Sequence, residues 1–174
     1  VWLPRAVVAA EDQRFHEHAG YDLVEMRAAW RSGAKANLHP RGASTLSQQL
    51  AKLLYTGDER SAARKLREAL YAVEMDRVLG KARVLQLYLA VAPWGGGLCG
   101  AQAASLQLLN KRASALTPIE AAWLASLLRN PEAELARAGA NGSVDKARVA
   151  DIIEAMRPLA VEAGVTLASR SRAA

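Results

Sequence analysis

Three groups of polar residues in the first half of the chain have types and spacings that could carry out chemistry. The first is a pair of acids, the second gathers hydroxyls, amides and a lysine, and the third sets two cations beside an acid. The groups are Glu11 and Asp12; Ser44, Thr45, Gln48, Gln49 and Lys52; and Arg64, Lys65 and Glu68. If the fold brings them together, two carboxylates meet several cations. That combination suits the displacement of a diphosphate from a sugar carbon by a hydroxyl group.

The acids and the cations have different tasks in such a displacement. Glu11 would accept the proton of the attacking hydroxyl, and a positioned general base contributes roughly 10²- to 10⁴-fold in rate. The cations would hold the departing diphosphate, where charge stabilisation is usually the larger contribution. Taken alone, Arg64, Lys65 and Glu68 are more typical of a solvated ion pair, which contributes only about 0.3–0.5 kcal/mol.

A short helix must position the second group. Thr45 and Gln48 have the spacing of a capping box, so we expect a helix to begin here and run to Lys52. One face of this helix is apolar and is expected to meet a core; it carries Leu46, Leu50, Leu53 and Leu54. Its N-terminus presents free N–H groups and partial positive charge, so the polar face predicts an anion- and sugar-binding surface. An ordinary solvated face would have the same pattern.

Apolar spacing and helix-terminating residues predict helices along most of the chain. They cover residues 4–15, 22–36, 60–79, 82–91, 101–109, 117–129 and 144–156. Asp22 and Thr117 are expected caps, Gly80 an expected stop, and residues 139–143 an expected loop. The inner face of the 60–79 helix is predicted to carry Leu66, Leu70 and Val73.

Composition and charge limit the class of protein. With 174 residues the chain fits one domain, and its low aromatic content of 5% with abundant Ala and Leu favours an all-α fold. A net charge of +6 favours an anionic partner, and the basic, amphipathic 22–36 helix could rest on a membrane surface or be an ordinary surface helix. The single cysteine, Cys99, excludes an internal disulfide.

The sequence around these groups resembles the peptidoglycan glycosyltransferases. This family comprises the monofunctional transglycosylases and the transferase domains of bifunctional penicillin-binding proteins. Residues 11–20, EDQRFHEHAG, are similar to its EDxxFxxHxG signature, and residues 64–68, RKLRE, to its RKxxE signature. The second motif resembles residues 42–52, the fourth residues 85–89 with 95–100, and the fifth residues 116–131. All five follow in the family's order, and the resemblance covers about residues 5–131.

The resemblance implies an all-α, lysozyme-like fold of two lobes that polymerises lipid II into glycan strands. By position, Glu11 is the general base that activates the acceptor's 4-hydroxyl, Glu68 assists at the donor's diphosphate, and the anomeric centre is inverted. Asp12 would support Glu11, and the remaining polar residues would bind substrate. These are Ser44, Thr45, Gln48, Gln49, Lys52, Arg64 and Lys65.

The resemblance also implies partners and a location. The sequence requires no cofactor, and a divalent cation, Mg²⁺ or Mn²⁺, could act at the diphosphate with ligands left unassigned. His16 and His18 are expected to be structural. The expected partners are lipid II, the growing glycan, the membrane surface and other cell-wall synthesis proteins, with no nucleic acid. The expected location is the periplasmic face of the inner membrane, with peripheral attachment.

We interpret residues 1–174 as one glycosyltransferase domain, in which a motif-bearing core at 5–131 precedes a helical part with a frayed tail. The family's N-terminal membrane anchor is expected to be absent from this chain. Five positions depart from the family's pattern: Leu53, Ala90, Gln102, Leu108 and Leu109. They motivate an alternative, a degenerate relative that binds lipid-linked substrate or a cell-wall partner without turnover. A glycan-cleaving enzyme is a third reading, disfavoured by the cations.

Overall fold

The computed structural model describes residues 1–36, 44–57, 61–141 and 145–162. These residues form helices and no β-strand, so the predicted all-α fold is confirmed. The α-helices are α1 (Trp2–Glu11), α2 (Leu23–Ala36), α3 (Leu46–Ala51), α4 (Ala62–Val91), α5 (Ala101–Leu109), α6 (Pro118–Ser126), α7 (Pro131–Asn141) and α8 (Lys146–Glu162). Shorter turns are the π-helix η1 (Lys52–Thr56) and the 3₁₀ helices η2 (Ala113–Ala115) and η3 (Leu127–Arg129).

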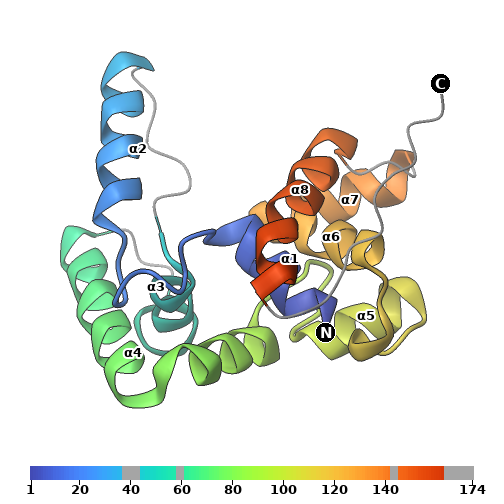
Figure 1. Cartoon of the computed structure of the whole chain (residues 1–174), viewed down its shortest axis with the longest axis horizontal. Helices are drawn as coiled ribbons and strands as arrows, with labels where there is room; N and C mark the ends of the chain where they lie inside the picture. The colour runs from blue at the N-terminus through green and yellow to red at the C-terminus, as the bar shows by residue number, and fades with distance from the viewer. Residues whose placement is uncertain (37–43, 58–60, 142–144, 163–174) are drawn as a thin grey trace.

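The helices form two groups joined by α4 (Figure 1). In one group α3 packs on α4, and α2 stands beside them; in the other, α1 packs against α6 and α8. The largest side chains buried in the core include Trp94, Phe15, Leu46 and Leu124. This arrangement agrees with the two-lobed helical architecture that the resemblance implied, and it places the end of α1 beside the start of α3.

The predicted helix caps are confirmed. Thr45 Oγ1 accepts the backbone N–H of Gln48, and the Gln48 side chain accepts the N–H of Thr45, which completes the capping box of α3. Thr117 and Glu120 form the same arrangement at α6. Asp22 caps α2 by accepting two backbone N–H groups. Three of the predicted elements therefore begin where local side-chain hydrogen bonding sets them.

Helix α4 confirms the predicted break and contradicts the predicted inner face. Gly80 has φ 73°, which interrupts the helical backbone, and the chain then resumes a helix to Val91. Leu66 and Leu70 are 63% and 62% exposed, so they do not face the core. The buried face carries Glu68 instead, because its charge is neutralised by neighbouring cations while α3 packs against that side.

Two other predictions differ from the structure near the ends of helices. Leu53 and Leu54 are about two-fifths exposed (41% and 42%), because the chain changes from α3 to the π-helix η1 at Lys52 and the apolar stripe turns away from the core. Helix α1 ends at Glu11, before the expected Phe15, because Asp12 leaves the helical conformation.

The C-terminal helices were also only partly predicted. Helix α7 occupies residues that were given no element, and the expected loop from Gly139 begins inside it. Helix α8 continues through Pro158, although a proline lacks the N–H of a helical hydrogen bond. Burial of Ile152 and Met156 against the core stabilises this helix. The predictions for residues 42–43, 60, 142–144 and the C-terminal tail lie outside the described residues.

Candidate active site

Glu11 is the last residue of α1, and both oxygens of its carboxylate are engaged. Oε2 accepts a hydrogen bond of 3.2 Å from Gln49 Nε2, and Oε1 accepts one of 3.2 Å from Arg148 Nη2. The Glu11 side chain is 12% exposed. Burial raises the pKa of Glu11 above its ordinary value of 4.5, and the Gln49 hydrogen bond and the Arg148 charge act in the lowering direction. A base with a raised pKa takes up a proton more readily.

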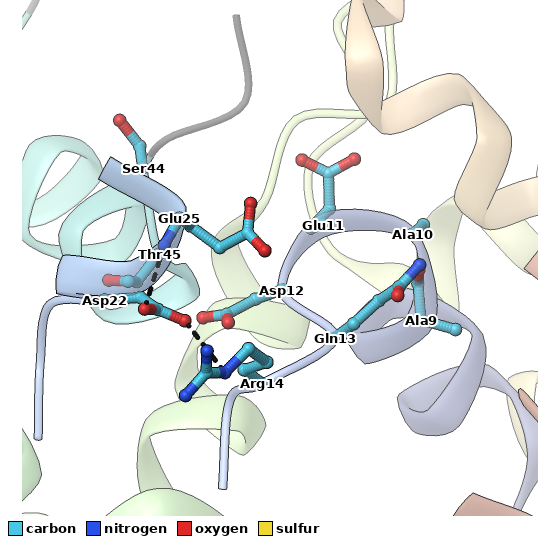
Figure 2. A pocket seen from close by; sticks show the side chains of 10 residues that line it. All are labelled: Ala9, Ala10, Glu11, Asp12, Gln13, Arg14, Asp22, Glu25, Ser44 and Thr45. Carbon is cyan, nitrogen blue, oxygen red and sulfur yellow. Dashed lines mark hydrogen bonds and ion pairs between the residues drawn. The ribbon is translucent and has the colours of Figure 1, made fainter. Parts of the chain in front are cut away.

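Two hollows meet at Glu11. The smaller, of about 250 Å³, is lined also by Asp12, Ser44 and Thr45, and Figure 2 shows that the carboxylates of Glu11 and Asp12 point in different directions. The larger, of about 800 Å³, has three arginines in its wall. Ser44 lines both hollows.

The side chain of Asp12 is also buried, at 5% exposed. Its carboxylate accepts the backbone N–H of Leu46 at 2.9 Å and contacts His18 Nε2 at 3.0 Å. His18 Nδ1 in turn lies 3.3 Å from Lys81 Nζ, and Lys81 pairs with Asp76. Asp12 thereby ties the end of α1 to the start of α3, which fits the predicted supporting role and the structural role expected of His18.

The cation group is joined to the hollows through Ser44. Lys65 Nζ donates to Ser44 Oγ at 2.7 Å and to Glu68 Oε2 at 3.1 Å. Arg64 also pairs with Glu68, whose side chain is only 2% exposed. Lys65 is the more accessible cation, with a side-chain exposure of 47% against 14% for Arg64. The buried Glu68 therefore holds two cations in place, and Lys65 presents its charge beside Ser44.

The other predicted binding residues have mixed positions. Gln49 faces the site, since its amide contacts Glu11 and lines the larger hollow. Thr45 and Gln48 are buried, and their side chains form the capping box. Lys52 is half-buried where α3 passes into η1. The structure thus brings Glu11, Ser44 and Gln49 together, and it gives Thr45 and Gln48 a structural task.

Sequence reasoning missed Arg148. It lies 137 positions from Glu11, on a helix that was predicted to carry no chemistry. Its Nε also donates to the carbonyl of Ser126 at 3.4 Å, which anchors the guanidinium. A lone arginine on an amphipathic helix gives no local signal, because its partner is defined only when α8 packs against α1.

The five departures from the family's pattern lie outside the contacts of Glu11. Gln102 accepts the backbone N–H of Ala113 at 3.1 Å, and Leu108 and Leu109 pack against the core. Leu53 and Ala90 are exposed. The hydrogen bonds of Glu11 and Glu68 therefore involve none of these five positions.

The carboxylates near the site do not offer a ready metal centre. Both oxygens of Glu68 contact cations, and both oxygens of Glu11 accept N–H donors. Within the described ranges no group of three or more His, Cys, Asp or Glu side chains is arranged to hold a metal ion. A donor set already neutralised by lysine and arginine does not fit a divalent cation held by the protein.

The fold and the site define an all-α enzyme domain with a buried acid at the meeting point of two hollows and a lysine beside it. Residues 2–157 match the family model described as Transglycosylase, and the chain belongs to this family. Proteins called "Biosynthetic peptidoglycan transglycosylase" are similar to it. The one from Citrobacter koseri is 42% identical over 165 residues, 95% of this chain and 67% of the relative.

Two further relatives carry the same name. The Klebsiella oxytoca protein is 44% identical over 161 residues, 92% of this chain and 66% of the relative. The Nitrosomonas eutropha protein is 43% identical over 129 residues, 74% of this chain and 53% of the relative. The chain thus spans between about half and two thirds of the length of these curated relatives.

Proposed function

We propose that this domain is a peptidoglycan glycosyltransferase that polymerises lipid II into glycan strands. The observation that carries the proposal is the position of Glu11, a desolvated carboxylate that shares its hollows with Ser44 and, through Ser44, reaches Lys65. A base and a diphosphate-binding cation on two sides of one hydroxyl match the requirements of glycosyl transfer from a lipid diphosphate. The names of the relatives favour the same reaction.

In the proposed reaction the 4-hydroxyl of the acceptor attacks the anomeric carbon of the donor. Glu11 takes the hydroxyl proton, the new C–O bond forms with inversion, and the bond to the lipid diphosphate breaks. Lys65 and Arg64 stabilise the negative charge that develops on the leaving diphosphate. Glu68 is buried between them and acts through their position rather than by contact with the substrate.

The charges present can serve the leaving group without a protein-bound metal. Lys65 has an ammonium group, and nearly half of its side chain is exposed. Arg64 pairs with the same buried carboxylate, that of Glu68. A divalent cation carried by the diphosphate itself remains a prediction of the family resemblance, and no step of the proposed reaction depends on it.

An apolar surface supports attachment to a membrane, where lipid-linked substrates are found. It is formed by η1 and the first turns of α4, which touch through the ring contact of Tyr55 and Tyr71 at 5.0 Å. Its exposed members are Leu53, Leu54, Tyr55, Leu66, Leu70 and Tyr71. Exposed apolar patches rimmed by polar residues are typical of interaction surfaces. We infer peripheral attachment at the periplasmic face of the inner membrane, with the glycan strand and other cell-wall synthesis proteins as partners.

No described helix combines the length and apolar content needed to cross a bilayer.

The test is incubation of the chain with labelled lipid II in detergent. The wild-type domain is expected to form glycan polymer, and Glu11→Gln is expected to form none while keeping its helical circular dichroism. Binding of lipid II by the wild type without any polymer would favour the non-catalytic relative. Polymer formation by Glu11→Gln at the normal rate would overturn the assignment of the base.

A further inference from the structure

Tyr88 is a buried polar residue that the proposed mechanism does not use. It lies in α4 after the Gly80 kink, and it is 2% exposed within the hydrophobic core. A buried phenol must satisfy its hydroxyl, and its Oη donates to Gln49 Oε1 at 2.9 Å. The one hydrogen-bond donor of the Tyr88 side chain therefore binds the residue that contacts the general base.

This contact anchors the oxygen end of the Gln49 amide. The amide oxygen receives the Tyr88 hydroxyl, and the amide nitrogen faces two acceptors, Glu11 Oε2 at 3.2 Å and the Ser44 carbonyl at 3.4 Å. All three contacts agree with this orientation. In the flipped amide the oxygen would face the Glu11 carboxylate and the Ser44 carbonyl, so both of these contacts would be lost, and the Tyr88 hydroxyl would have to accept instead of donate.

We propose that Tyr88 is a positioning residue: it fixes the Gln49 amide so that its N–H group points at Glu11 and favours the ionised carboxylate. The Tyr88 hydroxyl binds Gln49, and Tyr88 acts on the carboxylate through that residue. The role of Tyr88 in catalysis rests on the proposed function. Its effect on the ionisation of Glu11 is a property of the protein and does not depend on that function.

The other groups around Glu11 define what the Gln49 contact must achieve. Arg148 from α8 donates to the second carboxylate oxygen, Arg129 from η3 adds positive charge, and Asp12 adds negative charge. Burial opposes ionisation and is the largest of these influences. The Gln49 N–H group is a neutral donor, and in a fixed orientation it stabilises the ionised form of Glu11. It does so without adding another charge beside the carboxylate.

The experiment titrates Glu11 directly. The carboxyl ¹³C signal of Glu11, assigned by its absence in Glu11→Gln, is followed by NMR against pH in the wild type and in Tyr88→Phe. Tyr88→Phe is expected to raise the midpoint by about one pH unit, which corresponds to about a tenfold change in the ionisation equilibrium. Tyr21→Phe, which removes an exposed hydroxyl in a loop, is the matched control and is expected to leave the midpoint unchanged.

A double-mutant cycle shows whether Tyr88 acts through Gln49. In a Gln49→Met background the added Tyr88→Phe change is expected to leave the midpoint where Gln49→Met alone puts it. Equal, additive shifts in both backgrounds would overturn the proposal, as would an unchanged midpoint in a folded Tyr88→Phe protein.

The lipid II assay separates this inference from the proposed function. In an active domain the acid limb of the pH–rate profile of Tyr88→Phe should move upward by the same amount as the NMR midpoint. A uniform loss of rate at every pH, with no displaced limb, would indicate a purely structural role and overturn the inference. If the wild type made no polymer, the proposed function would fail, and the NMR titration would still decide the role of Tyr88.

Discussion

At the scale of single residues, the proposed reaction depends on a carboxylate that is costly to ionise. Burial raises the pKa of Glu11, so the native state holds its proton more tightly than the unfolded chain does. Stability attributable to this group therefore falls as pH rises from its ordinary value of 4.5 through the raised value. Ionisation of Glu11 therefore reduces stability, and the proposed reaction requires it.

The direction of this pKa shift gives a prediction for the stability of Glu11→Gln. Glutamine resembles the protonated acid, so the variant avoids the cost of the buried charge. We expect its midpoint of thermal unfolding at pH 7 to be no lower than that of the wild type, and the difference to shrink as the pH is lowered through the raised pKa of Glu11 to its ordinary value of 4.5. Calorimetric scans at both pH values check this. A markedly lower midpoint at pH 7 would mean that Glu11 stabilises the fold.

Arg148 gives a second prediction at this scale. Its charge lowers the pKa of Glu11, so Arg148→Ala should move the acid limb of the pH–rate profile upward, and Arg148→Lys should partly restore it. At neutral pH we expect a rate loss of about 10- to 100-fold for the alanine variant, since a charged hydrogen bond contributes about 1.5–3 kcal/mol. An unshifted limb in a folded Arg148→Ala protein would contradict this role.

At the scale of elements, a closed ring of contacts fixes the start of α3 against the end of α1 and the kink of α4. Asp12 accepts from Leu46 N and contacts His18, His18 contacts Lys81, and Lys81 pairs with Asp76. Ser47, next to Leu46 in α3, closes the ring by donating to Asp76 at 2.7 Å. The φ of 73° at Gly80 allows the turn that precedes Lys81.

We predict that Lys81→Met breaks this ring. It leaves the buried Asp76 without its counter-charge, which costs about 3 kcal/mol when a buried pair loses one member. Urea unfolding measures this cost. Lys111→Met, which removes the lysine of a more exposed pair with Glu120, is the matched control and should unfold near the wild-type midpoint. Equal effects of the two changes would contradict the ring as a stabilising unit.

The elements also show how far the sequence could predict this molecule. The caps at Thr45 and Thr117 and the break at Gly80 were predictable because each depends on neighbours within three residues. The inner face of α4 was not predictable from the spacing of its leucines. Glu68 is buried there because two cations pair with it and α3 packs against it, and the leucine spacing carries no information about either.

The same reason explains the part of the site that was missed. Glu11, Ser44 and Gln49 were found because motif spacing identifies them. Arg148 and Tyr88 were not assigned, because their contacts join residues 137 and 39 positions apart. Roles that depend on long-range packing require the folded structure, and these two residues add contacts around Glu11 and Gln49, of which Glu11 is the base that the sequence predicts.

At the scale of the whole molecule, the two helix groups divide the tasks. The group of α3 and α4 carries Lys65 and the apolar surface, and the group of α1, α6 and α8 carries Glu11 and Arg148. A substrate anchored in a membrane would meet the cations and the apolar surface on one group and the base on the other. Membrane attachment and catalysis should therefore be separable by mutation.

We predict that Leu66→Ser combined with Leu70→Ser weakens binding to vesicles of anionic phospholipid at least tenfold, since burying a leucine side chain contributes about 1.5–3 kcal/mol. Both side chains are exposed, so thermal stability should not change. Ile119→Ser, at a 61% exposed position on α6, is the control and should leave vesicle binding intact. Unchanged sedimentation of the double variant with vesicles would contradict attachment through this surface.

The central claim is that a base on one helix group and cations on the other act on a single lipid-linked saccharide. The most direct test is the rate of one coupling step as a function of donor concentration, measured for Glu11→Gln and Lys65→Met. We predict that Glu11→Gln abolishes turnover while binding of the lipid-diphosphate donor persists, and that Lys65→Met lowers kcat/KM for the donor at least tenfold. Normal coupling by either variant would contradict the claim.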